Sequence, residues 1–180
     1  MKIGIYGGSF NPIHFGHTGL AQWVVNNTDL DEVWLMVSPN NPLKDTSILA
    51  DEQVRLIEAR KAIANIQSPI AKQIVVSDFE FSLPRPTYTA NTLRALQEAY
   101  PEYEFTLIIG EDNLNIFNKW REYQYILDTY RIFVYPRRNI ISQTSQQHED
   151  ILRKANNVKL LADAPYFDIS STELRKNLHN

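Results

Sequence analysis

Residues 2–17 decide the fold, and they read Lys2-Ile3-Gly4-Ile5-Tyr6-Gly7-Gly8-Ser9-Phe10-Asn11-Pro12-Ile13-His14-Phe15-Gly16-His17. The apolar run over residues 2–6 is typical of a short buried strand, and the Gly7-Gly8 pair ends it in a turn. Asn11-Pro12 turns the chain again, and a helix is expected over residues 17–26. A strand, a glycine turn and a helix in this order predict the first unit of a sheet whose strands alternate with helices.

The same alternation continues along the rest of the 180 residues. Short apolar segments predict further strands at residues 32–38, 73–77, 105–109, 131–135 and 158–161. Helical composition and spacing predict helices at residues 51–64, 89–100, 123–128, 148–155 and 171–178, and residues 79–87 are expected to form an irregular loop. Strands that are apolar on both faces and alternate with helices indicate an α/β fold built on a doubly wound parallel sheet. We expect one domain over residues 1–180.

Composition and charge exclude several classes of function. The net charge of −3 leaves no basic face for a phosphate backbone, so we expect no nucleic-acid partner. The sequence has no cysteine, which rules out disulfides, thiolate nucleophiles and cysteine-ligated zinc. No apolar run approaches the roughly 20 residues that span a membrane, and no signal peptide is recognisable. These features predict a cytoplasmic protein without a membrane partner, and they do not bear on its oligomeric state.

The glycine turn and the two histidines after it suggest a phosphate-binding site. Gly7 and Gly8 carry no side chain, so a phosphate can approach the backbone amides at the end of the strand. His14 and His17 flank Gly16 at the expected start of a helix, where both imidazoles can face one anion. A lone histidine or glycine pair is usually structural, but their combination within one strand–turn–helix unit favours phosphate binding.

A second group of polar residues opens the expected last helix. Ser170, Ser171 and Thr172 place three hydroxyls at a helix N-terminus, which is a favourable site for phosphate oxygens. Arg175 follows one turn later and can grip a second phosphate. Ser170 and Glu173 also fit a capping box, which is a purely structural explanation of both.

The two groups together resemble the nucleotidyltransferase superfamily that includes the nicotinate-nucleotide adenylyltransferases. Residues 7–17 are similar to its histidine signature, and residues 168–175 are similar to the Ile-Ser-Ser-Thr-x-x-Arg motif that closes its ATP site. Asn11 stands where many relatives carry aspartate. The resemblance spans almost the whole chain and implies a Rossmann-like nucleotidyltransferase fold. The ATP-binding residues that it implies are Gly7, Gly8, Ser9, Phe10, Gly110, Asp112, Arg137, Ser170, Ser171 and Thr172.

Two middle segments favour a pyridine nucleotide as the acceptor. Residues 87–93 are similar to the family's Ser-Tyr-Thr-x-x-Thr-Leu segment, which implies that Tyr88 and Thr89 bind nicotinate mononucleotide. Thr89 opens a helix whose N–H groups can hold a carboxylate, although a plain N-cap is equally expected there. The indole of Trp120 suits a flat pyridine ring, with a packing tryptophan as the alternative.

Two further basic residues enter through the resemblance. Lys44 matches a lysine that the family places near the reacting phosphates. Arg137 follows a strand where relatives often have Arg-Pro-Gly, but Arg138 is adjacent, so either arginine can be the matching one. Asp112, at the end of another strand, is placed to bond a ribose hydroxyl.

The resemblance implies transfer of the adenylyl group of ATP to nicotinate mononucleotide, a step of NAD biosynthesis. His14, His17, Lys44 and Arg175 would be the catalytic residues, together with Mg²⁺ that is bound through the ATP phosphates and not by a protein cage. The alternatives are a same-fold adenylyltransferase acting on nicotinamide mononucleotide or phosphopantetheine, and a nucleotide-binding module without catalysis. The phosphopantetheine enzymes usually have threonine at the position of His14.

Overall fold

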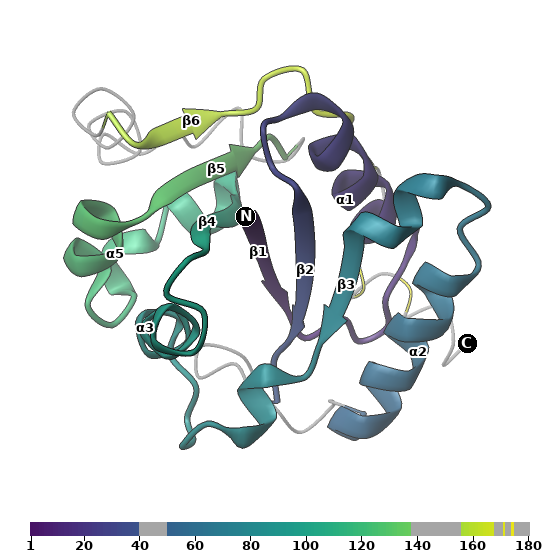
Figure 1. The fold of residues 1–180 in the computed structure, drawn as a ribbon, viewed down its shortest axis with the longest axis horizontal. Helices are drawn as coiled ribbons and strands as arrows, with labels where there is room; N and C mark the ends of the chain where they lie inside the picture. Colours follow the sequence, from purple (N-terminus) through teal and green to yellow (C-terminus); the bar gives the residue numbers. More distant parts are fainter. Residues whose placement is uncertain (40–49, 138–155, 168–170, 172–173, 175–180) are drawn as a thin grey trace.

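The computed structural model describes residues 1–39, 50–137 and 156–167, together with residues 171 and 174. These residues contain one parallel sheet with the strand order β3-β2-β1-β4-β5-β6 (Figure 1). The strands are β1 (Lys2–Gly8), β2 (Glu32–Val37), β3 (Ile74–Ser77), β4 (Glu104–Gly110), β5 (Arg131–Tyr135) and β6 (Val158–Leu160). The order reverses between β1 and β4, as in doubly wound sheets. The predicted fold class is confirmed.

Helices cover both faces of the sheet. They are α1 (Phe15–Asn27), α2 (Glu52–Ala64), α3 (Thr89–Ala99), α4 (Glu111–Leu114) and α5 (Tyr123–Thr129). Figure 1 shows α1 and α2 on one side and α3 and α5 on the other. Each face has its own core: Ile108 packs in the cluster with α1 and α2, whereas its neighbours Leu107 and Ile109 pack in the cluster with α3 and α5. This two-sided burial explains why the strands are apolar without alternation.

Two boundaries differ from the expected ones. Strand β1 continues through Gly8 and so includes the glycine pair that was expected to end it, and α1 begins at Phe15 and not at residue 17. His14 is the N-cap residue in extended conformation, and its N–H donates to Nδ1 of His17 at 3.2 Å. A histidine at the third helical position thus reaches back to the cap as a glutamate does in a capping box. The expected loop at 79–87 contains the short 3₁₀ helix Phe79–Ser82.

Of the two helices expected near the end of the sequence, the structure describes only two residues. Residues 148–155 lie outside the described residues. Within residues 171–178, Ser171 and Leu174 are described, and both are helical.

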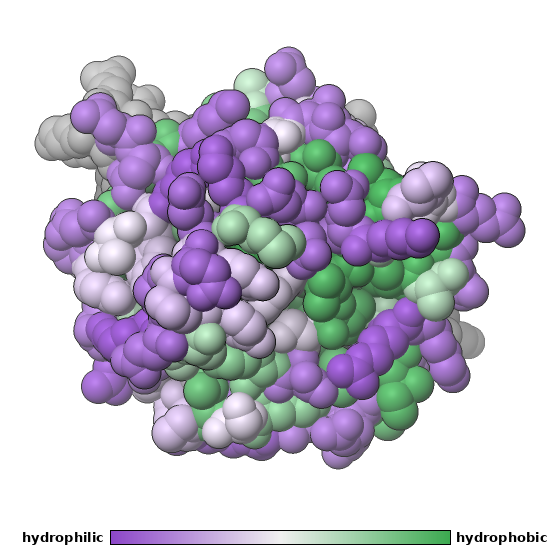
Figure 2. Space-filling model, viewed as in Figure 1, coloured by the Kyte–Doolittle hydropathy of each residue, from purple (hydrophilic) through white to green (hydrophobic). Residues whose placement is uncertain are grey.

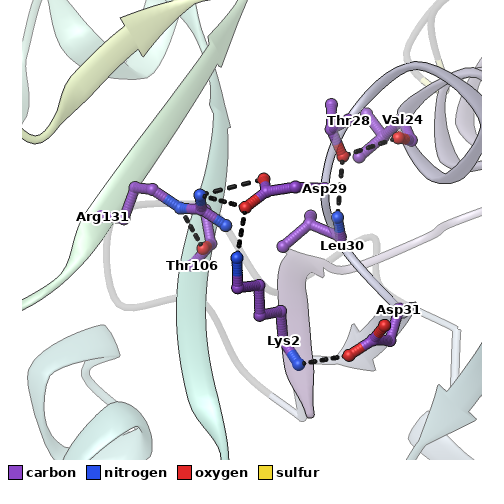
Figure 3. Close-up of polar contacts among 8 residues, drawn as sticks. All are labelled: Lys2, Val24, Thr28, Asp29, Leu30, Asp31, Thr106 and Arg131. Carbon is purple, nitrogen blue, oxygen red and sulfur yellow. Dashed lines mark hydrogen bonds and ion pairs between the residues drawn. The ribbon is translucent and has the colours of Figure 1, made fainter.

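The amino ends of the strands are joined by an exposed cluster of charges (Figure 3). Asp29, in the turn between α1 and β2, accepts from Lys2 Nζ at 2.8 Å, and Arg131 Nη1 contacts both of its carboxylate oxygens at 2.9 Å. Arg131 Nε also donates to Thr106 Oγ1 at 2.9 Å. We call Lys2, Asp29, Thr106 and Arg131 the amino-edge cluster; it ties β1, β4 and β5 to the α1–β2 turn.

The surface in this view is mainly hydrophilic, with hydrophobic residues gathered between β3 and α2 (Figure 2). Val54 and Ile57 of α2 are among the exposed hydrophobic side chains. Across the described ranges, no helix has both the length and the apolar character that a membrane crossing requires.

Candidate active site

The predicted site residues gather at the carboxyl ends of the strands. The sheet is parallel, so β1, β4 and β5 all end at one edge, at Gly8, Gly110 and Tyr135. The edge lies beside the reversal of strand order between β1 and β4, where open α/β sheets bind their ligands.

His14 and His17 form a stacked pair at this edge. Their ring centroids lie 3.7 Å apart with an interplanar angle of 27°. Because Nδ1 of His17 accepts the His14 N–H, the proton of a neutral His17 ring is on Nε2, which is then a donor. The edge of the Phe10 ring supports His17 at a centroid distance of 5.0 Å. The two imidazoles thus lie together, and their binding to one phosphate stays a prediction.

His14 has an unusual electrostatic environment. Its Nδ1 is buried and has no hydrogen-bond partner among the described residues. Burial lowers the pKa of His14 to about 4, and the charge of Arg137 contributes in the same direction. The ring is therefore neutral at pH 7, and a buried polar atom without a partner is costly unless a ligand supplies one. A phosphate oxygen fits this requirement when the proton of the neutral ring is on Nδ1, which then donates to it.

The turn between β1 and α1 combines open space with a supported loop. A Cβ on Gly7 would meet nothing within 4 Å, whereas one on Gly8 would lie 3.0 Å from the Phe10 ring. Phe10 is 2% exposed and has φ 45°, a left-handed conformation that is strained for a large side chain. The Phe10 side chain therefore lies beneath His17 and does not line the site, while Gly7 leaves room for a ligand.

The two ends of the sequence meet at this turn. Ser171 Oγ donates to the Pro12 carbonyl at 2.9 Å across 159 positions of sequence. Nearby, Phe167 packs edge-to-face on Phe15, with ring centroids 6.0 Å apart. The two motifs are therefore in contact at Ser171, and their joint binding of ATP stays a prediction. Lys44, Ser170, Thr172 and Arg175 lie outside the described residues.

Gly110, Asp112 and Arg137 form a second polar group at the carboxyl edge. A Cβ on Gly110 would overlap Oδ1 of Asp112 and lie 3.1 Å from the Tyr135 ring, so a larger residue requires the Asp112 side chain to move. Arg137 Nε lies 3.7 Å from Asp112 Oδ1, and its Nη2 donates to Tyr135 OH at 2.9 Å. Burial opposes the charge of Arg137, but Tyr135 and Asp112 outweigh it and raise the pKa. Arg137 thus lies at the edge; Arg138 is outside the described residues.

The predicted acceptor residues come together beside α3. Tyr88 is the N-cap of this helix and Thr89 its first helical residue, so the expectation of Thr89 as the cap is wrong by one position. Tyr88 offers no side-chain hydrogen bond to the first turn. The Arg121 guanidinium lies 4.9 Å from the Tyr88 ring centroid, which joins the two segments. Trp120 is half-buried against Phe117, and its Nε1 has no partner among the described residues.

Three polar residues at this edge were missed by the sequence reasoning: Arg55 and Glu80, which are buried, and Ser38, which is half-buried. Arg55 is 1% exposed on α2. Its buried position could have been recognised, because Arg55, Ala59 and Ile63 follow one another at intervals of four residues. Ala59 and Ile63 are apolar and buried, so Arg55 lies on the same buried face of the helix. A charged residue on the apolar stripe of a helix signals a buried polar role. Glu80 follows no such pattern.

Comparison with known proteins first gives the general class of protein to which the chain belongs. Residues 5–177 match a family model described as cytidylyltransferase-like. A nicotinic acid mononucleotide adenylyltransferase of Plasmodium falciparum, complexed with NaAD, has the same fold, with a TM-score of 0.79 at 24% identity over 97% of this chain and 82% of that one.

Sequence relatives narrow the class further. A protein of Flavobacterium psychrophilum is 44% identical, covering 100% of this chain and 88% of that one, and one of Bacteroides fragilis is 44% identical, covering 98% and 82%. Both are named probable nicotinate-nucleotide adenylyltransferase. The chain belongs to the nicotinate-nucleotide adenylyltransferase family.

Proposed function

We propose that the protein transfers the adenylyl group of ATP to nicotinate mononucleotide, forming deamido-NAD and pyrophosphate. Family membership gives the class of reaction. The observation that carries the proposal is the buried Nδ1 of His14, which has no partner within residues 1–39, 50–137 and 156–167, in a ring stacked on His17 beside the open space at Gly7. This arrangement offers backbone amides, a helix N-terminus and two imidazoles to one anion.

The chemistry needs alignment more than proton transfer. The attacking group is a phosphate monoester, which is already anionic at neutral pH, so neither a strong general base nor a covalent intermediate is required. Its oxygen forms a bond to the α-phosphorus of ATP, and the bond from that phosphorus to pyrophosphate breaks. Catalysis then rests on in-line placement and on stabilising the charge that develops. His14, His17, Lys44 and Arg175 take this role.

The ATP side also uses groups on β4, β5 and the last helix. Asp112 accepts from the ribose, while Gly110 lets the nucleotide approach the strand end. The Ser171 hydroxyl donates its proton to the Pro12 carbonyl. We therefore expect the hydroxyls of Ser170 and Thr172 to donate hydrogen bonds to the phosphates. Arg137, held by Asp112 and Tyr135, supplies a positive charge beside His14.

The acceptor side lies at the start of α3. This helix of 11 residues begins without a side-chain cap, so its first N–H groups are available to the nicotinate carboxylate. Trp120 presents its indole to the pyridine ring, with Tyr88 and Thr89 beside it. We expect Trp120→Ala to raise KM for the acceptor about tenfold, the loss of roughly one stacking contact. A defect confined to KM for ATP would contradict this placement.

Mg²⁺ is the proposed cofactor and enters with ATP. The described residues include no group of three or more His, Asp or Glu side chains able to hold a metal, and the Glu111 and Asp112 carboxylates are engaged with Arg137. This donor set fits an ion held by phosphates and water. When bound, Mg²⁺ would neutralise charge on the phosphates.

A pyrophosphate-release assay with a panel of acceptors tests the function. We expect release with ATP and nicotinate mononucleotide, and much slower release with nicotinamide mononucleotide or phosphopantetheine. A preference for either of these would contradict the acceptor assignment. Binding of ATP without release for any acceptor would favour a nucleotide-binding module.

A further inference from the structure

Four polar side chains, three buried and one partly buried, connect residues 7–17 with helix α3. They are Arg55 of α2, Ser38 after β2, Glu80 of the 3₁₀ helix Phe79–Ser82 and Thr92 of α3, and we call them the Arg55–Thr92 network. Residues 7–17, which span the end of β1, its connection to α1 and the start of α1, are called the 7–17 loop. Arg55, Glu80 and Thr92 are 1%, 7% and 2% exposed. Burial of such groups is costly unless each finds partners.

The Arg55 end of the network fixes backbone. Its Nη1 donates to the carbonyls of Ser9 at 2.6 Å and Ser38 at 2.8 Å. Its Nη2 and Nε donate to Pro39 at 3.1 Å and Ala50 at 3.0 Å. Four of its five N–H donors are thus satisfied by carbonyls, and burial lowers its pKa. Arg55 therefore holds the 7–17 loop against the end of β2.

The Glu80 end continues from the same serine. Ser38 Oγ donates to Glu80 Oε2 and Thr92 Oγ1 to Glu80 Oε1, both at 2.7 Å. Ser38 N also donates to Gly8 O at 2.9 Å. Thr92 lies in the first turn of α3 and contacts the carbonyl of the Tyr88 cap at 3.3 Å. Ser38 is therefore shared between the loop and the start of α3.

We propose that the Arg55–Thr92 network sets the position of the 7–17 loop relative to the start of α3, with Arg55 and Glu80 as positioning residues for adenylyl transfer. This inference rests on the proposed function, in which ATP lies at the loop and the acceptor at α3. In-line attack needs the two substrates aligned, and a misplacement of about 1 Å costs on the order of 10²-fold in rate. A substitution of Glu80 leaves the contacts within each binding segment in place. We therefore expect its defect to fall on kcat and to spare the KM values of both substrates.

Glu80 variants test the acceptor end. Glu80→Met removes both acceptors at similar length, and we expect the single-turnover rate at saturating substrates to fall about 10- to 100-fold. Glu80→Gln keeps one acceptor and offers an N–H to the other hydroxyl, so it should retain most of that rate. Equal loss in both variants would contradict a role through these hydrogen bonds.

Arg55 variants test the loop end. Arg55→Met leaves four carbonyls without their donor, and we expect a rate loss at least as large as that of Glu80→Met. Arg55→Lys keeps the charge but has a single nitrogen that cannot reach all four, so its rate should fall between Met and wild type. An Arg55→Lys variant no better than Arg55→Met would contradict the proposed role.

Two smaller substitutions test the network if the Arg55 and Glu80 variants fold poorly. Ser38→Ala and Thr92→Val each remove one hydroxyl donor to Glu80. Because both break the same connection, the double variant should lose little more rate than the worse single variant. Additive losses would contradict a continuous network.

Matched exposed residues serve as controls. Arg60→Met lies on the same helix as Arg55, in a surface ion pair with Asp78, and Glu98→Met lies on the exposed side of α3; both should keep wild-type rates. Rates are normalised to the folded fraction from thermal unfolding. Wild-type protein without turnover contradicts the proposed function and this inference together. Active wild type with folded, fully active network variants contradicts the inference alone.

Discussion

The two edges of the sheet treat their polar groups in opposite ways. At the amino edge, Asp29 meets two cations, and Arg131 adds a hydrogen bond to Thr106. At the carboxyl edge, His14 Nδ1 and Trp120 Nε1 are buried without partners among the described residues. The charged groups of the amino edge are thus engaged with one another, whereas two buried nitrogens of the carboxyl edge, His14 Nδ1 and Trp120 Nε1, remain for ligands.

The comparison also separates two uses of charge. The three charged side chains of the amino-edge cluster are 34% to 47% accessible, so their ion pairs are screened and contribute little stability each. At the carboxyl edge the Arg137 guanidinium is partly buried between Tyr135 and Asp112. A charge kept in such a place serves recognition better than stability.

The largest expected difference between the edges concerns turnover. His17→Ala should lower kcat by about 10² or more, the scale of removing one transition-state donor. Asp29→Asn at the amino edge should leave kcat unchanged. Steady-state pyrophosphate release measures both, and near-normal turnover of His17→Ala would remove the catalytic assignment.

Alanine substitutions at two glycines distinguish a glycine needed for packing from one that leaves space for a ligand. Gly110→Ala should lose about 1–3 kcal/mol of unfolding free energy, because its Cβ crowds the Tyr135 ring and displaces the Asp112 side chain from its ion pair with Arg137. Gly7→Ala should change stability by less than about 1 kcal/mol, since its Cβ meets nothing. It should nevertheless weaken ATP binding about tenfold or more. Urea unfolding and ATP titration give the two readouts, and normal ATP affinity of Gly7→Ala would place the phosphates elsewhere.

A smaller effect is expected for stability against pH at His14. The folded pKa is lowered from 6.5 to about 4, so the unfolded chain binds the proton first as pH falls. Stability is therefore undiminished above pH 6.5 and declines as pH falls toward 4. His14→Asn should flatten this decline by less than about 1 kcal/mol, because the ring is partly solvated. Unfolding midpoints across this range check the sign.

The smallest effect is expected at the amino edge. Arg131 and then Lys2 hold the pKa of Asp29 well below its ordinary 3.8. The ion pairs therefore add stability above pH 3.8, which is lost as pH falls through the lower folded value. Asp29→Asn should cost about 0.5 kcal/mol at neutral pH, and less in high salt. A salt-independent loss would show that packing, not charge, is responsible.

The sheet could be predicted from the sequence because each strand is a short apolar run bounded by glycine or a turn. The site could be predicted where a motif is local, as for His14 and His17. Arg55 and Glu80 were missed because their partners, the carbonyls of Ser9 and Ser38 and the hydroxyl of Thr92, come from other segments. The early start of α1 was missed because it depends on a histidine acting as a capping side chain.

The hydrogen bond from Ser171 to Pro12 has a consequence for the timing of synthesis. The two residues are 159 positions apart, and chains grow at about 5–20 residues per second. The turn that carries the histidines therefore lacks its hydrogen bond to Ser171 for on the order of 10 s of synthesis. Through that interval a nascent chain can form the first strands without the contact between Ser171 and Pro12, so this side of the nucleotide site is completed only after residue 171 has been synthesised.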